Sequence, residues 1–369
     1  MITSTTIDVS HGAETYPVTY DDNSSTGASL QNSFKYVKTN VPGPGFDKDT
    51  FSEQFVGCDC SKVCTTNSCS CLQLFGGSVY DGNGRLKVDI LRDLSSKPVL
   101  ECGRECSCDP VHCTNRIVQQ GIKKTLCIFH TKDKGYGLML DNNKNSEISS
   151  LSFVCEYAGE VIGDAEARKR LKQTDITAES NYLIALREHV SGTEACIYID
   201  PRYLGNVGRF INHSCDPNLF MVPVRANHLV PRLALFARKN IKPGEELTFD
   251  YSGNSTLNVS DFIAIVEPIN SQIGPLNSET SNSSDISLHS TLMHMTQNSQ
   301  SSESYFNPPK KRTKFQNEGH CSVENSNLED HQKDELTVKL NQSVKRKPCF
   351  CGSYNCSGLL PLDSTLLCD

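Results

Sequence analysis

Clustered cysteines constrain this chain more than any other feature of its sequence. The chain has 18 cysteines, and nine of them lie between Cys58 and Cys113. Three CxC pairs in this block place thiols close together along the chain, where they are poor disulfide partners but good metal chelators. We therefore expect a metal cluster built from Cys58, Cys60, Cys64, Cys69, Cys71, Cys102, Cys106, Cys108 and Cys113.

Zinc bound by thiolates is the expected form of this cluster. The segment Met1–Gly12 has no apolar stretch of the kind found in secretory signals, so disulfides are not expected. Nine thiolates complete three tetrahedral zinc sites if three of them each bridge two ions. Such a cluster has no open ligand position, so its effect is stability and not chemistry. A reduced cysteine-rich loop or a disulfide knot is the alternative.

Charge and hydropathy narrow the classes of partner. The net charge of −7 argues against a protein that coats nucleic acid by bulk charge, so direct DNA binding is not indicated, and it suits a basic partner. No stretch approaches the roughly 20 apolar residues of a membrane span, so no membrane contact is expected. The basic runs Pro308–Lys314 and Lys345–Lys347 fit nuclear localisation signals, although a solvated charge run is equally compatible.

Composition divides the chain into five regions. Residues 1–50 are polar and predict a poorly ordered lead-in. Residues 51–120 hold the cysteine block and few apolar runs, whereas residues 121–252 look globular. Residues 253–344 are rich in Ser and Asn, without hydrophobic periodicity, and predict a disordered insertion. Residues 345–369 carry a second cysteine block and a short tail.

The globular region is predicted to be mostly β, with many short strands and one clear helix. Leu151–Ile162 indicates a strand pair or one long bent strand. A helix is expected from Asp164 to Gln173, with basic residues toward its C-terminal end, where the helix dipole favours cations. Further strands are expected at Asn181–Leu186, Cys196–Asp200, Met221–Val224, Leu233–Ala237 and Glu246–Tyr251.

Four further motifs, taken in order, indicate a family. The ten-residue run RFINHSCDPN is the most specific of them, whereas GxG alone usually marks a turn. Together with the cysteine block, they resemble the SET-domain lysine methyltransferases of the SUV39 type, over about residues 55–252 and 345–369. The motifs are KGYG at Lys134–Gly137, EYAGE at Glu156–Glu160 with SNY at Ser180–Tyr182, RFINHSCDPN at Arg209–Asn218, and GEELTFDY at Gly244–Tyr251.

The resemblance implies a fold, a cofactor and a set of site residues. The fold is a SET domain of short curved sheets with a pseudoknot, flanked by pre-SET and post-SET zinc modules; its threading is an exception among proteins. The implied cofactor is S-adenosylmethionine, held by Lys134, Gly135, Tyr136, Tyr182, Arg209, Asn212, His213 and Phe350. The implied catalytic residues are Tyr251, Tyr157 and Phe249. For Tyr157 and Tyr182 taken alone, ordinary core packing is the alternative.

The second cysteine block resembles the post-SET motif. Cys349, Cys351 and Cys356 supply three thiolates, and the resemblance implies Cys215 as the fourth ligand of one more zinc ion. The site is expected to form despite the long insertion after Tyr251, because each doubling of a flexible loop costs only about 0.6 kcal/mol. A structural zinc site contributes about 10–16 kcal/mol.

The resemblance implies a histone methyltransferase of the nucleus and chromatin, with the histone H3 tail or the nucleosome as its partner. Family habit favours lysine nine of H3. The members fused to a transposase, which share SNY, LALFA, DYSG and KPCFCG, raise lysine thirty-six or four. Phe249 stands where a Tyr favours fewer methyl groups, so di- or trimethylation is expected. A methyltransferase of non-histone proteins and a non-enzymatic zinc-containing chromatin scaffold remain alternatives.

Overall fold

The computed structural model describes residues 7–20, 30, 33–61, 63–92, 94, 99–143, 146–177, 180–190, 193–253 and 347–361. The predicted Ser/Asn-rich insertion, apart from residue 253, lies outside these residues. So does the basic run Pro308–Lys314. Among the described helices, none combines the length and apolar character that crossing a bilayer requires.

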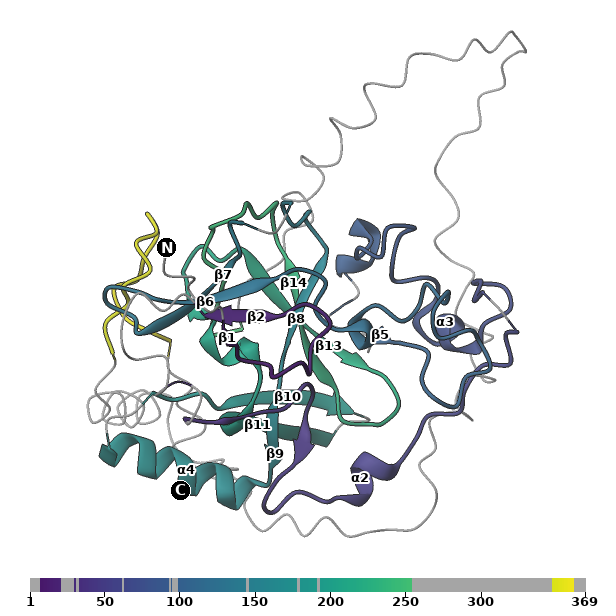
Figure 1. Ribbon diagram of the computed structural model, residues 1–369. Coiled ribbons are helices and arrows are strands. Elements are labelled where there is room, and N and C mark those ends of the chain that lie inside the picture. Colours follow the sequence, from purple (N-terminus) through teal and green to yellow (C-terminus); the bar gives the residue numbers. More distant parts are fainter. Residues whose placement is uncertain are drawn as a thin grey trace, which may run out of the picture.

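Short strands dominate the fold, as the sequence predicts (Figure 1). The helices are α2 (Asp49–Ser52), α3 (Ser70–Phe75) and α4 (Asp164–Thr177), with 3-10 turns at Val88–Arg92, Val118–Gln120 and Val207–Phe210. The strands are β1 (Ile7–Asp8), β2 (Val18–Tyr20), β3 (Lys35–Tyr36), β4 (Val41–Pro42), β5 (Val99–Leu100), β6 (Leu126–His130), β7 (Tyr136–Leu140), β8 (Phe153–Tyr157), β9 (Gly159–Ile162), β10 (Ile184–Val190), β11 (Thr193–Gly205), β12 (Asn212–His213), β13 (Leu219–Arg225), β14 (Arg232–Ala237) and β15 (Thr248–Phe249).

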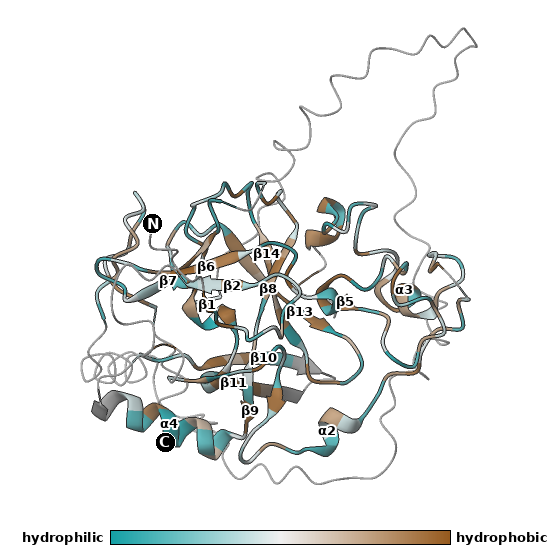
Figure 2. Cartoon of the chain, viewed as in Figure 1, coloured by the Kyte–Doolittle hydropathy of each residue, from teal (hydrophilic) through white to brown (hydrophobic). Residues whose placement is uncertain are grey.

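The sheets join strands that are far apart in the sequence. One sheet has the order β1-β2-β6-β7, a second has the order β10-β11-β9-β4 with β3 beside β11, and a third has the order β5-β13-β14-β8. Figure 2 shows that hydrophobic residues concentrate on central strands such as β6, β8 and β14, whereas α4 is largely hydrophilic. Fully buried side chains such as Ile128, Leu138 and Leu233 fill the core between the sheets.

The N-terminal residues differ from the poorly ordered lead-in that their composition predicts. Within residues 7–50, β2 pairs with β6, β3 with β11 and β4 with β9, all in parallel. Side chains add contacts, since Thr39 Oγ1 donates to Glu156 at 2.9 Å and Asn40 Nδ2 donates to the Pro231 carbonyl at 3.1 Å. Strands of two or three residues in a polar segment carry no readable hydrophobic period, which is why composition misses them.

The strand pair predicted at Leu151–Ile162 is confirmed as β8 and β9, and the other expected strands overlap β10, β11, β13, β14 and β15. The helix begins at Asp164, as predicted, but continues to Thr177. Its basic residues therefore lie in mid-helix and not in the last turn. Arg168 pairs with Asp164 at 3.0 Å, so a carboxylate one turn earlier compensates its charge, and the helix dipole does not.

The cysteine block lies against the third sheet. In Figure 1, the segment that contains α3 and β5 lies on one side of the fold, and the C-terminal segment, in yellow, lies on the opposite side. β5 pairs with β13, and buried Glu101 follows it directly. The Glu101 carboxylate accepts a hydrogen bond from the Tyr80 hydroxyl at 2.8 Å, and others from the backbone N–H groups of Ile117 and Val118, each at 2.8 Å. These bonds fix the end of the cysteine block to the domain.

Candidate active site and metal centres

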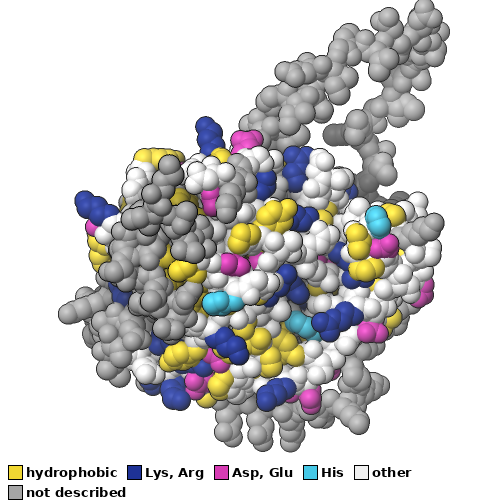
Figure 3. Space-filling view, viewed as in Figure 1, with side chains coloured by type: hydrophobic (Ala, Val, Ile, Leu, Met, Phe, Trp, Pro, Cys, Tyr) yellow, Lys and Arg dark blue, Asp and Glu magenta, His cyan; other side chains and the backbone are white. Residues whose placement is uncertain are grey.

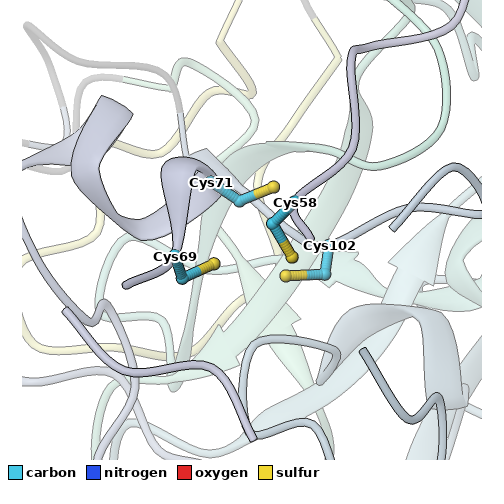
Figure 4. A group of neighbouring side chains, drawn as sticks. All are labelled: Cys58, Cys69, Cys71 and Cys102. Carbon is cyan, nitrogen blue, oxygen red and sulfur yellow. The ribbon is translucent and has the colours of Figure 1, made fainter. Parts of the chain in front are cut away.

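The nine cysteines of the first block form one largely buried cluster. Figure 4 shows four of them, Cys58, Cys69, Cys71 and Cys102, with their sulfurs grouped together. None of the described cysteines forms a disulfide. Three overlapping sets of four sulfurs each lie within 4.8 Å of one another, and Cys58 belongs to all three sets. Overlap of this kind is what shared, bridging ligands require.

The spacing of the sulfurs fits metal ligands. Cys64 lies 3.8 Å from Cys58 and 3.7 Å from Cys102, measured between sulfurs. A tetrahedral zinc ion with Zn–S bonds of about 2.3 Å places its sulfurs roughly 3.8 Å apart. A disulfide would hold them about 2.05 Å apart. This arrangement is therefore suited to a metal cluster, and the donor set is the one that zinc prefers.

A second group of four sulfurs joins two distant parts of the chain. Cys215, Cys349, Cys351 and Cys356 place their sulfurs within 4.8 Å of one another. Asn355 strengthens this junction, because its side-chain amide donates to the Cys215 carbonyl at 3.0 Å. The structure thus brings together all four residues that the sequence predicts as ligands of the second metal.

Three aromatic side chains meet where β12 and β15 pair. β12 and β15 run in parallel and place His213 opposite Phe249. The ring of Phe249 lies 4.8 Å from that of Tyr251 and 6.0 Å from that of Tyr157. Phe249 and Tyr157 are buried, whereas Tyr251 is 43% exposed. Phe249 therefore lies buried between two tyrosine rings, of which that of Tyr251 reaches the surface.

Hydrogen bonds fix the two tyrosines. The Tyr251 hydroxyl donates to the Ile211 carbonyl at 2.9 Å, and the Tyr157 hydroxyl donates to the Tyr182 carbonyl at 2.5 Å. Desolvation raises the pKa of both phenols, so both hydroxyls stay protonated near neutral pH. Burial lowers the pKa of His213, and its neutral ring accepts the backbone N–H of Tyr251 at 3.2 Å.

Lys134 and Asn212 both contact Glu246, a residue that was not predicted from the sequence as part of the site. The Lys134 ammonium lies 2.6 Å from Glu246, and the Asn212 amide donates to the same carboxylate at 3.0 Å. Asn212 also donates to the Tyr136 carbonyl at 3.1 Å. Gly135 lies between Lys134 and Tyr136 in the chain. Its φ is 73°, and there is open space where a side chain would stand. The loop backbone is therefore accessible to a ligand.

Arg209 is surrounded by aromatic rings. Its guanidinium lies 4.4 Å from the ring centre of Phe34, 4.6 Å from that of Tyr182 and 5.0 Å from that of Phe210. Burial lowers the pKa of Arg209, yet it remains a cation at neutral pH. No ion pair among the described residues includes Arg209, so its charge is available to an anionic group.

Two predicted residues differ from the rest of the site. The Tyr136 ring packs edge-on against Phe210 and Tyr20, at 6.2 Å and 6.1 Å, so it serves the core as well as the loop. Phe350 is 53% exposed, and no ring contact among the described residues joins it to the other site residues. Glu246 stood inside a motif already identified, whereas Phe34 carries no signal in the sequence.

Family models match both halves of this arrangement. The Pre-SET motif matches residues 10–116, and the SET domain matches residues 145–252. The first match begins inside the segment that composition predicts as a lead-in. The chain belongs to the SET-domain histone-lysine methyltransferases that carry a pre-SET motif, and it is an enzyme of that class.

Individual proteins and solved structures of this family are similar to the chain over most of its length or over its larger part. Histone-lysine N-methyltransferase SETMAR from Bos taurus is 35% identical over 370 residues, which cover 98% of this chain and 91% of that protein. The methyltransferase domain of human SETMAR superposes with a TM-score of 0.64 and 33% identity, over 96% of this chain and 98% of the other. Arabidopsis thaliana SUVH6, solved in complex with SAM, has a TM-score of 0.51 and 31% identity, over 68% and 50% of the two chains.

Proposed function

We propose that this histone-lysine methyltransferase transfers methyl groups from S-adenosylmethionine to a lysine of the histone H3 tail in chromatin. The carrying observation is the group of Tyr157, Phe249 and Tyr251, packed together beside His213. Arg209 stacks on the ring of Tyr182, whose carbonyl accepts the Tyr157 hydroxyl. An amine held between aromatic rings is shielded from water, which favours its neutral form. Lysine nine is the first candidate position, and lysines thirty-six and four are the next.

The chain's residues fit the proposed cofactor. S-adenosylmethionine, when bound, supplies an electrophilic methyl group on a positively charged sulfur. Its carboxylate needs a cationic partner, and Arg209 has no ion pair among the described residues. Its ribose and base need accessible backbone, which the open loop at Gly135 offers. SUVH6, whose structure is similar, was solved in complex with SAM. We assign Lys134, Gly135, Tyr136, Tyr182, Arg209, Asn212, His213 and Phe350 to this site.

The chain's contribution to catalysis is alignment of a neutral amine. Free lysine has a pKa of about 10.4, so its amine is charged in water at neutral pH. Desolvation between Tyr157 and Phe249 lowers that pKa. The hydroxyls of Tyr157 and Tyr251 already point at backbone carbonyls, so their positions are fixed before substrate arrives. Fixed geometry of this kind contributes to the rate by orientation, without a strong base.

Phe249 sets the proposed number of methyl groups. It is 5% exposed and lies between Tyr157 and Tyr251. A tyrosine here would carry a hydroxyl able to hold a water molecule against the amine. Phenylalanine leaves that volume apolar and open, so a methylated amine has room to turn for another transfer. We therefore assign di- or trimethylation to this enzyme.

Zinc is the metal assigned to both cysteine groups. Three ions would occupy the nine-cysteine cluster, and one would occupy the site formed by Cys215 and the C-terminal cysteines. The thiolate donor set and the sulfur spacing near 3.7 Å support zinc. Both sites have all their positions filled by protein ligands, so their part is structural. His213 Nε2 lies 3.4 Å from the Cys215 sulfur, so a metal bound there would stand beside the proposed active site.

Methyl transfer from labelled S-adenosylmethionine to nucleosomes and to a panel of H3 peptides tests this function. Wild type is compared with Tyr251→Phe and with the matched control Tyr16→Phe, since both tyrosines are 43% exposed. We expect transfer by wild type and by the control, and a large loss in Tyr251→Phe. Transfer only to other proteins would favour the non-histone alternative, and no transfer at all would favour a scaffold.

Nuclear localisation follows from the proposed substrate. The basic run at Lys310–Lys314 is the candidate signal, and it lies outside the described residues. Replacing the four basic residues of this run by neutral ones should move a fluorescently tagged protein out of the nucleus without affecting transfer to peptides. An unchanged nuclear distribution would exclude this run as the signal.

A further inference from the structure

Aromatic rings surround the guanidinium of Arg209, and no acid among the described residues forms an ion pair with it. The nearest of the three rings is that of Phe34, at 4.4 Å, compared with 4.6 Å for Tyr182 and 5.0 Å for Phe210. One hydrogen bond completes the set, from Nε to the Pro201 carbonyl at 3.2 Å. The direction in which the guanidinium fork points is therefore set largely by ring faces.

Phe34 comes from a different part of the chain than the other rings. It lies just before β3, which pairs in parallel with the end of β11. The backbone N–H of Val37 also donates to the Gly205 carbonyl at 2.9 Å, and the Tyr36 hydroxyl donates to Glu14 at 3.1 Å. The N-terminal segment is thus fixed to β11 immediately after Phe34, which holds its ring in place.

Phe34 also contacts the core side of the site. Its ring meets that of Phe210 edge-on, with 5.6 Å between centroids and an interplanar angle of 70°. Phe210 in turn lies 6.2 Å from Tyr136 of the KGYG loop. One residue of the N-terminal segment therefore touches both Arg209 and the aromatic layer beneath the loop.

We propose that Phe34 is a positioning residue for the cofactor site and that it acts through Arg209. The inference rests on the proposed function, in which Arg209 binds the cofactor. A ring face attracts a guanidinium by electrostatics as well as by contact, and the attraction strengthens as water is excluded. An aliphatic residue of similar size fills the same space without that attraction, so the planar fork loses the orientation that recognition of a carboxylate needs.

Substitutions that separate ring from volume test the proposal. Phe34→Leu removes the ring, Phe34→Tyr keeps it, and Phe46→Leu is the control. Phe46 belongs to the same N-terminal region, and its ring pairs with Phe51 at 5.6 Å, apart from Arg209. The dissociation constant for S-adenosylmethionine is measured by calorimetry, and the melting temperature is measured for every variant.

We expect Phe34→Leu to weaken binding of S-adenosylmethionine about three- to tenfold. Phe34→Tyr should stay within about twofold of wild type. Phe46→Leu should lower the melting temperature without changing the affinity. In an Arg209→Lys background, the effect of Phe34→Leu should shrink, because the compact ammonium lacks the planar face that stacks on the ring.

Three outcomes would overturn the inference. They are wild-type affinity in Phe34→Leu, equal losses in the Leu and Tyr variants, and a loss in Phe34→Leu that persists undiminished when Arg209 is replaced. The proposed function fails separately, because it predicts that wild type binds S-adenosylmethionine and methylates H3. A wild type that does both beside an unaffected Phe34→Leu variant refutes the positioning role alone.

Discussion

The Lys134 ammonium lies 2.6 Å from the Glu246 carboxylate, which also accepts the Asn212 amide at 3.0 Å. Glu246, in the GEELTFDY motif, thus joins two segments that are far apart in the sequence. These are the KGYG loop and the RFINHSCDPN run. Lys134 and Glu246 are both less than one-third exposed, so water screens this pair only partly. Glu246 therefore determines where both neighbours point.

Glu246→Gln should weaken binding of S-adenosylmethionine about three- to tenfold. The neutral amide cannot form an ion pair with the Lys134 ammonium, so the lysine is held less firmly. A partly exposed ion pair contributes on the order of 1 kcal/mol, which corresponds to about fivefold in affinity. Calorimetric titration measures the effect, and exposed Glu147→Gln serves as the control. Equal affinities in wild type and Glu246→Gln would show that the acid does not organise the site.

Removal of all zinc should abolish methyl transfer. Cys215→Ser should impair transfer by disrupting the second metal site alone. Loss of Cys215 leaves the second site with three thiolates, so elemental analysis should show one zinc fewer per chain than in wild type. Activity should fall by at least tenfold while the melting temperature changes little, because the large cluster is intact. Cys196→Ser is the control, since Cys196 belongs to neither group of clustered sulfurs. An active Cys215→Ser enzyme with unchanged zinc content would contradict the assignment.

Phe249→Tyr should shift the product toward monomethyl-lysine. The new hydroxyl would stand between Tyr157 and Tyr251 and would reduce the space in which a methylated amine turns. Mass spectrometry of an H3 peptide after prolonged reaction measures the distribution of products. First-methyl transfer should remain within about tenfold of wild type, because the other two rings are unchanged. Strict monomethylation by wild type would contradict the role of Phe249.

Glu156→Gln should stabilise the protein more at pH 7 than at pH 4.5. Burial is the main cause that raises the pKa of Glu156 to about 6. The folded state therefore holds this proton more tightly than the unfolded state does, and stability is lost as pH rises from about 4.3 to 6. The neutral amide avoids this loss, which is roughly 2 kcal/mol at most.

Urea unfolding of both proteins at pH 4.5, 5.5 and 7 measures the difference in free energy of unfolding. The comparison is made between the two proteins at each pH, because acid weakens metal thiolates equally in both. A difference that stays constant with pH would mean that Arg232, 3.4 Å away, keeps Glu156 ionised throughout.

Features encoded by short runs of residues could be predicted from the sequence. The CxC pairs indicated a metal cluster because neighbouring thiols cannot separate far, and the structure gathers all nine. The runs around Asn212 and Tyr251 indicated the family, which the Pre-SET and SET matches show. Leu151–Ile162 revealed β8 and β9 because both strands are buried along their length.

Features that depend on distant partners could not be predicted. β2 and β3 are strands of three and two residues, which pair with β6 and β11. Their stability comes from these partners and not from their own sequence pattern. Phe34 is an ordinary phenylalanine in a polar stretch until the fold brings Arg209 to it. Glu246 lay inside a quoted motif, but nothing local indicates that Lys134 is its partner.

The parallel pairing of β2, β3 and β4 has a practical consequence for handling this enzyme. A shortened protein that begins at the first cysteine block would leave β6 and β9 as unpaired sheet edges and the end of β11 without β3. Unpaired edges recruit strands from other molecules and cause aggregation. Insolubility of such a fragment would then result from missing strands and not from missing zinc. Adding back the residues before Cys58 would restore solubility, whereas added metal would not.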